Sequence, residues 1–143
     1  MKILAENKKA KFDYDIKETY TAGMVLTGAE VKAAKTGNVS LAGSYVTINQ
    51  AKAQLINCHI GPYKYARQEN YNPTQSRGLL LNKQEINQLV GKEKGTVLIP
   101  LSVFLGRGGR LKLSIGLGRA RKKTDKREYI KERDTKREIR NSY

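Results

Sequence analysis

The sequence has very little of the chemistry that most catalytic or metal sites use. It contains one cysteine, Cys58, and one histidine, His59, in 143 residues. A single cysteine excludes an internal disulfide framework and fits a reducing compartment, and the two residues together are too few soft ligands for structural zinc. Adjacent residues on a strand point to opposite faces, so Cys58 and His59 cannot form a nucleophile and base pair. We therefore expect no catalytic step, no metal and no other cofactor.

Long hydrophobic runs are also missing. No stretch approaches the roughly 20 apolar residues of a membrane-spanning helix. Residues 1–9 lack an apolar segment of the length that a secretory signal needs. We therefore expect a cytoplasmic protein without a membrane partner, and a chain of this length predicts one compact domain with an appendage.

Acidic residues are scarce relative to basic ones. The chain has 28 Lys and Arg against 13 Asp and Glu, a formal net charge of +15. Such a charge repels itself in a compact chain, and a polyanionic partner would offset it. Nucleic acid is the first candidate, because phosphate neutralisation by Lys and Arg dominates such affinity. An anionic membrane surface is the second, but it requires an apolar anchor that the sequence lacks.

Hydrophobic periodicity and turn residues divide the first 118 residues into short elements. The alternation of Phe12, Tyr14 and Ile16 with polar residues predicts a strand. Two helices are expected, at 28–34 and, with Asn82 as N-cap, at 82–90. Two hairpins are expected, pairing 45–48 with 53–60 and 96–105 with 110–115. The pattern predicts a mainly β protein, a small OB-like antiparallel barrel with short helices.

Two polar segments allow more than one interpretation. Residues 63–78 are either a long surface loop or a binding segment, and their tyrosines either stack on unpaired bases or are ordinary amphipathic residues. Residues 106–110, GRGGR, are either an RGG-like RNA contact or a glycine turn. Under either interpretation of residues 106–110, Arg107 and Arg110 add positive charge to this segment.

The composition changes at Arg119, which predicts a barrel at 1–118 and a basic C-terminal tail at 119–143. The tail holds 11 Lys and Arg and 5 Asp and Glu, with few large apolar side chains. It cannot bury enough apolar surface to fold alone, so we expect it to be disordered when free and helical when bound. The alternative is a solvated, salt-bridged tail without a partner. Wound as an α-helix, the tail places six cations within an arc of about 60°: Arg119, Lys122, Lys126, Arg133, Arg137 and Arg140.

Five sequence blocks, in this order, resemble the small protein B family, the SsrA-binding proteins of bacteria. They are NKKAKFDY at 7–14, GAEVK at 28–32, HIGPY at 59–63, LLLNKQEI at 79–86 and KKTDKR at 122–127. The resemblance covers the chain almost end to end. It departs from the family pattern at 71–78, which keeps one positive charge, and at Thr124, where relatives often have His or Tyr.

The resemblance implies a six-stranded OB-like barrel that binds the tRNA-like domain of transfer-messenger RNA (tmRNA). It also implies delivery of this RNA to stalled ribosomes for nascent-chain tagging and ribosome rescue, which is trans-translation. The barrel is expected to cup the elbow of the tRNA-like domain, and the tail to enter the decoding centre and the mRNA channel of the ribosome. The protein is expected to be a monomer without a catalytic step.

The expected contact residues fall into two groups. Glu30 is expected to orient rather than to supply charge, because an acidic residue on an RNA-facing surface must be held there by another interaction. RNA contacts are expected from Asn7, Lys8, Lys9, Lys11, Glu30, Lys32, His59, Tyr63, Arg77 and Lys83. Ribosome contacts are expected from Arg119, Lys122, Lys123, Asp125, Lys126, Arg127, Arg133, Arg137 and Arg140.

Two other functions remain open from the sequence. The first is a general ribosomal or translation-factor-like OB-fold protein that binds RNA by charge and shape, without specificity for tmRNA. The second is a hydrolase acting on RNA, which the sequence favours least because it has neither paired general bases nor a metal cluster.

Overall fold

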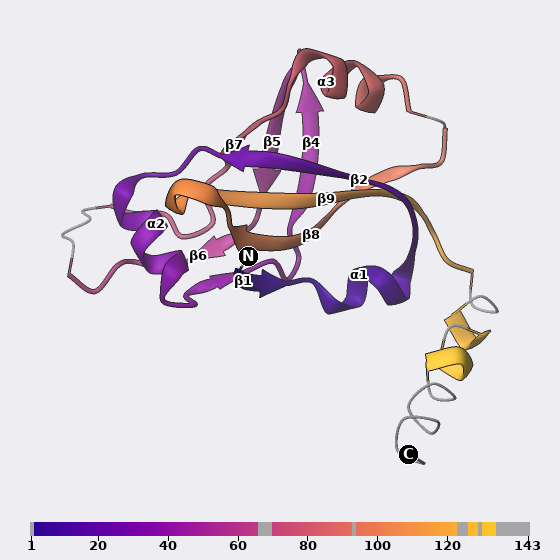
Figure 1. The fold of residues 1–143 in the computed structure, drawn as a ribbon, viewed down its shortest axis with the longest axis horizontal. Helices are drawn as coiled ribbons and strands as arrows, with labels where there is room; N and C mark the ends of the chain where they lie inside the picture. Colours follow the sequence, from indigo (N-terminus) through magenta and orange to yellow (C-terminus); the bar gives the residue numbers. More distant parts are fainter. Residues whose placement is uncertain (1, 66–69, 93, 123–125, 129, 134–143) are drawn as a thin grey trace.

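The computed structural model describes residues 2–65, 70–92, 94–122, 126–128 and 130–133. The chain is mainly β with short helices, as the sequence predicts (Figure 1). Residues 126–128 and 130–133 are also helical. In chain order the elements are β1 (Lys2–Glu6), α1 (Lys8–Asp13), β2 (Tyr14–Met24), α2 (Gly28–Lys35), β3 (Val39–Ser40), β4 (Tyr45–Asn49), β5 (Lys52–Ile56), β6 (His59–Ile60), β7 (Arg77–Leu80), α3 (Lys83–Val90), β8 (Val97–Leu105), the 3₁₀ turn η1 (Arg107–Gly109) and β9 (Leu111–Ala120).

Seven strands form one antiparallel sheet in the order β1-β8-β9-β2-β7-β5-β4. The sheet curls, because its last strand, β4, comes back into contact with β8 near the opposite edge. Strands β3 and β6 form a separate two-stranded sheet beside α2. The long strands β2 and β9 pair over most of their length and run through the centre of the molecule (Figure 1).

The hydrophobic core lies on the inner side of the curled sheet. On β9, Leu111, Leu113 and Ile115 are buried, and the residues between them are half-buried, which is the period of two expected of a strand. Where β9 passes β2, a Cβ atom on Gly118 would lie 2.3 Å from the carbonyl oxygen of Asp15. No other residue type fits there, so this glycine sets how closely β2 and β9 approach.

Both predicted helices are confirmed, and each begins with a capping box. In α2, Thr27 accepts a hydrogen bond from the backbone N–H of Glu30, whose side chain accepts one from the Thr27 N–H. In α3, Asn82 and Glu85 make the same reciprocal pair. Each box satisfies two N–H groups that a helix start would otherwise leave without a partner.

The strand predicted around Phe12 is partly wrong. Phe12 lies in α1, and the strand begins only at Tyr14. The backbone N–H of Asn7 donates to the carbonyl of Leu101 on β8, 2.8 Å away, and α1 follows directly. This contact with a distant strand fixes where the chain turns from β1 into β2. A local period-two pattern cannot reveal such a contact, so the start of the strand was predicted too early. Strand β1 itself was not predicted.

Both predicted hairpins are confirmed, with different ends. The first hairpin pairs β4 with β5 and stops at Ile56, because Asn57 has a left-handed backbone with a φ of 62°. The next two extended residues, His59 and Ile60, pair with β3 instead. In the second hairpin, β9 runs on to Ala120, two residues past the boundary expected at Gly118.

Candidate nucleic-acid interface

Many of the exposed basic side chains lie at two ends of the molecule. Helix α1 precedes β2 and α2 follows it, so the two helices lie at opposite ends of this strand (Figure 1). With 11 residues at about 3.4 Å each, β2 separates them by roughly 35 Å. Most of the predicted RNA contacts are therefore divided between two surfaces that cannot meet at one phosphate.

The first surface, which we call the α1 end, carries Lys8, Lys9 and Lys11, and all three are exposed. Asn7 lies beside them but is half-buried, and its side-chain amide donates to the carbonyl of Pro100 at 2.9 Å. Asn7 thus fixes α1 against β8, whereas the three lysines present their charge to solvent.

The C-terminal segment leaves the sheet at the α1 end. The backbone N–H of Arg121 donates to the carbonyl of Asp13 at 2.8 Å, and its guanidinium Nε lies 3.2 Å from the carbonyl oxygens of Lys11 and Tyr14. The ammonium of Lys126 lies 3.4 Å from the carboxylate of Asp13. Both partners of that ion pair are about one-third exposed, and such a pair near the surface contributes about 1 kcal/mol or less.

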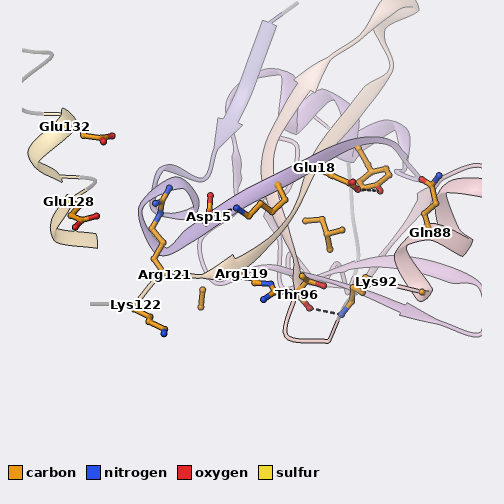
Figure 2. Close-up of a pocket in the computed structure, with 15 residues that line it drawn as sticks. Asp15, Glu18, Gln88, Lys92, Thr96, Arg119, Arg121, Lys122, Glu128 and Glu132 are labelled. Atoms are coloured by element: carbon orange, nitrogen blue, oxygen red, sulfur yellow. Dashed lines mark hydrogen bonds and ion pairs between the residues drawn. The ribbon is translucent and has the colours of Figure 1, made fainter. Parts of the chain in front are cut away.

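A groove of about 1250 Å³ separates the helical part of the tail from β2 and β9 (Figure 2). Its lining carries both signs of charge. The acidic side chains are Asp15, Glu18, Glu128 and Glu132, and the basic ones are Lys17, Lys92, Arg119, Arg121 and Lys122. A hydrogen bond and ion pair from Lys17, 2.7 Å away, lowers the pKa of Asp15 despite some burial. Since the walls are of mixed sign, this groove does not offer a continuous surface for phosphates.

The second surface, the α2 end, combines cations with aromatic rings. Lys32 on α2 is exposed, and its ammonium lies 5.7 Å from the ring centroid of Tyr63. Lys35, one turn further on, lies within 3.4 Å of a Cβ position built on Gly109, so the turn at 107–109 sits against α2. His59 is exposed on β6, and so are Arg107 and Arg110 beside that turn.

Glu30 and Arg77, both expected to contact RNA, form a buried ion pair beneath the α2 end. Their side chains are 2% and 1% exposed, and the guanidinium lies 2.6 Å from the carboxylate. Arg77 also donates to the carbonyl of Cys58 and to the hydroxyl of Tyr71. Tyr71 in turn donates to the carbonyl of Ile60 at 2.8 Å. The network ties α2, β6 and β7 together, and its two charges are not presented to the surface.

The electrostatics of this network fit an ionised pair. Burial by itself raises the pKa of Glu30, but the Thr27 backbone N–H and the Arg77 guanidinium outweigh it and lower that pKa. Burial raises the pKa of the Cys58 thiol to about 11. Cys58 is fully buried while His59 is exposed, as two adjacent residues pointing to opposite faces require.

The remaining predicted residues are placed as follows. Lys83 is exposed at the start of α3, away from both basic surfaces (Figure 1). Arg119 lies on β9, so it cannot share one helix with the rest of the expected stripe. Lys122, Lys126, Arg127 and Arg133 belong to the described part of the tail. Lys123, Thr124, Asp125, Arg137 and Arg140 lie outside the described residues.

Four contributors were missed by sequence reasoning. Lys35 and Lys64 extend the α2 end, Arg121 holds the base of the tail, and Tyr71 completes the buried network. Lys35 is separated from Lys32 by three positions, so helical spacing would have found it. Tyr71 lies 41 residues from Glu30, and no local pattern links the two.

Neither a metal centre nor a membrane span is found in the part of the chain that the structure describes. There is no group of three or more His, Cys, Asp or Glu side chains there that is able to hold a metal ion. No helix of that part is long and apolar enough to cross a membrane.

Comparison with known proteins assigns the whole chain to one set of relatives. Residues 4–143 match the model of the family described as SmpB protein. The SsrA-binding protein of Lactobacillus acidophilus is 48% identical over 143 residues, covering 99% of this chain and 94% of the relative. That of Bacillus subtilis is 43% identical over 144 residues, covering 99% and 92%. A solved structure described as "tmRNA-SmpB: a journey to the center of the bacterial ribosome" matches with a TM-score of 0.67 and 38% identity, over 82% of this chain and 84% of that chain.

Proposed function

The chain belongs to the SmpB protein family, and on this premise we propose that it is an RNA-binding factor of trans-translation. It binds the tRNA-like domain of tmRNA and delivers it to stalled ribosomes for nascent-chain tagging and ribosome rescue. The observation that carries the proposal is the family match over residues 4–143, together with a solved relative described with tmRNA and the ribosome. The protein supplies binding and orientation, and no catalytic step of its own.

The two basic surfaces suit two partners. Residues 1–118 form an OB-like barrel, and we assign its α2 end, with Lys32, His59 and Tyr63, to the elbow of the tRNA-like domain. The α1 end, with Lys8, Lys9 and Lys11, lies beside the base of the tail, so we assign it to RNA that the tail also contacts. A separation of roughly 35 Å lets one monomer hold both partners at once.

The tail is proposed to be disordered in the free protein and to become a helix in the decoding centre and mRNA channel. Lys126 and Arg133 lie within about 20° on a helix, which puts them on the same face. The ion pair that holds Lys126 to the barrel is half-buried and long at 3.4 Å, so phosphates can compete with it. The proposed partner also places the protein in the cytoplasm.

Binding to the isolated tRNA-like domain should depend steeply on salt. The basic surfaces offer many cations and few groups suited to reading base edges, so backbone and shape should dominate recognition. A protein that neutralises about six phosphates loses roughly a thousandfold in affinity between 50 and 200 mM salt. A titration by fluorescence anisotropy over this range measures the slope, and a slope near zero would contradict the proposal.

A pair of matched lysine variants locates the contact. Lys32 is exposed at the α2 end, so Lys32→Gln should remove one phosphate contact and reduce the slope of log affinity against log salt by about one. Lys52→Gln removes an equally exposed lysine from the start of β5, outside both basic surfaces, and should leave the slope unchanged. Equal salt slopes for the two variants would show that the RNA does not contact Lys32 at the α2 end.

A further inference from the structure

Tyr65 presents its ring to solvent beside the α2 end. The residue is 77% exposed, more than Tyr45 at 46% and more than the other exposed large hydrophobic residues of the described chain. A tyrosine ring combines a large apolar face with a polar hydroxyl, which suits it to an interface that is partly wet. The neighbouring Tyr63 is half-buried and packs against the hydrophobic core, so it provides a fixed support.

The two tyrosine rings contact each other. Their centroids are 5.5 Å apart and their planes meet at 69°, an edge-to-face arrangement. Such an aromatic pair contributes more stabilising free energy than its buried area alone accounts for. Tyr65 therefore rests its ring against a residue that the core holds in place.

Two lysines flank this pair. The ammonium of Lys64 lies 5.4 Å from the Tyr65 centroid, and that of Lys32 lies 5.7 Å from the Tyr63 centroid. Lys32 comes from α2, so the tyrosine pair is continuous with the basic surface there. The positive charge beside both rings favours an anionic partner.

We propose that Tyr65 stacks on one unpaired base of the bound RNA, while Lys32 and Lys64 face the phosphates on either side of it. Proteins that bind single-stranded nucleic acid combine exposed aromatic rings with neighbouring cations, since every base has a face on which an aromatic side chain can stack. The proposal deepens the function proposed above and rests on it, because it names the feature of the RNA that the α2 end selects. An A-form duplex has no unpaired base to offer.

The test compares three variants of the full-length protein. Tyr65→Leu removes the ring and keeps apolar bulk, Tyr65→Phe keeps the ring and removes the hydroxyl, and Tyr45→Leu is the matched control for an exposed tyrosine outside the α2 end. Affinities are measured by anisotropy for an isolated tRNA-like domain and for a blunt, fully paired RNA duplex of the same length. Thermal unfolding of each variant checks that the fold is intact.

Tyr65→Leu should bind the tRNA-like domain roughly fivefold to a hundredfold more weakly, the range for losing one stacked base. Tyr65→Phe and Tyr45→Leu should bind as the unchanged protein does, and all four proteins should bind the duplex equally. Three results would overturn stacking: no loss with Tyr65→Leu, an equal loss with Tyr65→Phe, or the same loss on the duplex. If the unchanged protein itself fails to bind the tRNA-like domain, the proposed function fails instead.

Discussion

Replacing Arg77 by methionine is expected to lower the free energy of unfolding by about 3–5 kcal/mol. The change keeps apolar bulk but leaves the carboxylate of Glu30 buried without a cation, and an uncompensated buried charge carries a penalty of this size. It also removes the donors to Cys58 and Tyr71, so those acceptors lose a partner inside the protein. Urea unfolding at pH 7 measures the change.

Two controls separate the buried charge from a general effect of losing arginine. Arg107→Met removes an exposed arginine from the turn beside α2 and should change stability by less than about 0.5 kcal/mol. Adding Glu30→Gln to Arg77→Met removes both charges and should restore part of the loss. A loss below about 1 kcal/mol for Arg77→Met alone would show that the network does not hold this end of the fold.

The Glu30–Arg77 pair should also make the free energy of unfolding depend on pH in the acid range. The pKa of Glu30 is lower in the folded protein than its ordinary value of 4.5. Its contribution is therefore complete above about pH 4.5 and is lost as the pH falls through the lower, folded value. The gap in stability between Arg77→Met and the unchanged protein should narrow over this window, because a protonated Glu30 no longer needs a cation.

Truncation after Lys122 is expected to abolish tagging of stalled nascent chains while leaving the affinity for the tRNA-like domain nearly intact. The cut keeps all of β9 and the contacts of Arg121 with α1, whereas a cut at Gly118 would remove the last β2–β9 pairs. In the described part of the removed segment, the ammonium of Lys126 contacts the rest of the chain through the half-buried ion pair with Asp13 and lies 5.6 Å from the ring centroid of Phe12. RNA affinity and tagging of the truncated protein are the two measurements.

Charge reversal tests the tail without shortening it. Reversing Lys126 and Arg133 to Glu puts negative charge against phosphate and should also abolish tagging. Lys131 lies about 140° from Lys126 around a helix, so Lys131→Glu should have a smaller effect. If a tail variant loses RNA affinity and tagging equally, the tail belongs to the RNA site of the barrel. If the truncated protein tags stalled chains fully, the tail is dispensable.

Sequence reasoning found the features that local signals determine. The helix at 28–34 was predicted from its good helix formers and the helix at 82–90 from Asn82 as its N-cap, and both signals are local in the sequence. The hairpins were predicted from alternating apolar residues and turn residues, and their ends were missed where one backbone dihedral decides, as at Asn57. Strand β1 was missed because its pairing with β8 joins segments about a hundred residues apart.

The candidate site divides in the same way. That Lys8, Lys32 and His59 are exposed follows from residue type, and the sequence predicted it. That Glu30 and Arg77 neutralise each other in the interior depends on a contact across 47 residues. Glu30 was expected to need another interaction to hold it, and the structure identifies that interaction as Arg77. The distance between the two basic surfaces follows from the length of β2 and its place in the sheet, which residue type does not determine.

The most direct test of the central claim is to sequence the RNA that co-purifies with the tagged full-length protein from cells. We expect tmRNA to be enriched far above its share of cellular RNA, with the enrichment retained after truncation at Lys122 and lost at high salt. Recovery of ribosomal and transfer RNA in their cellular proportions, without enrichment of tmRNA, would contradict the account and favour a general RNA-binding protein of the ribosome.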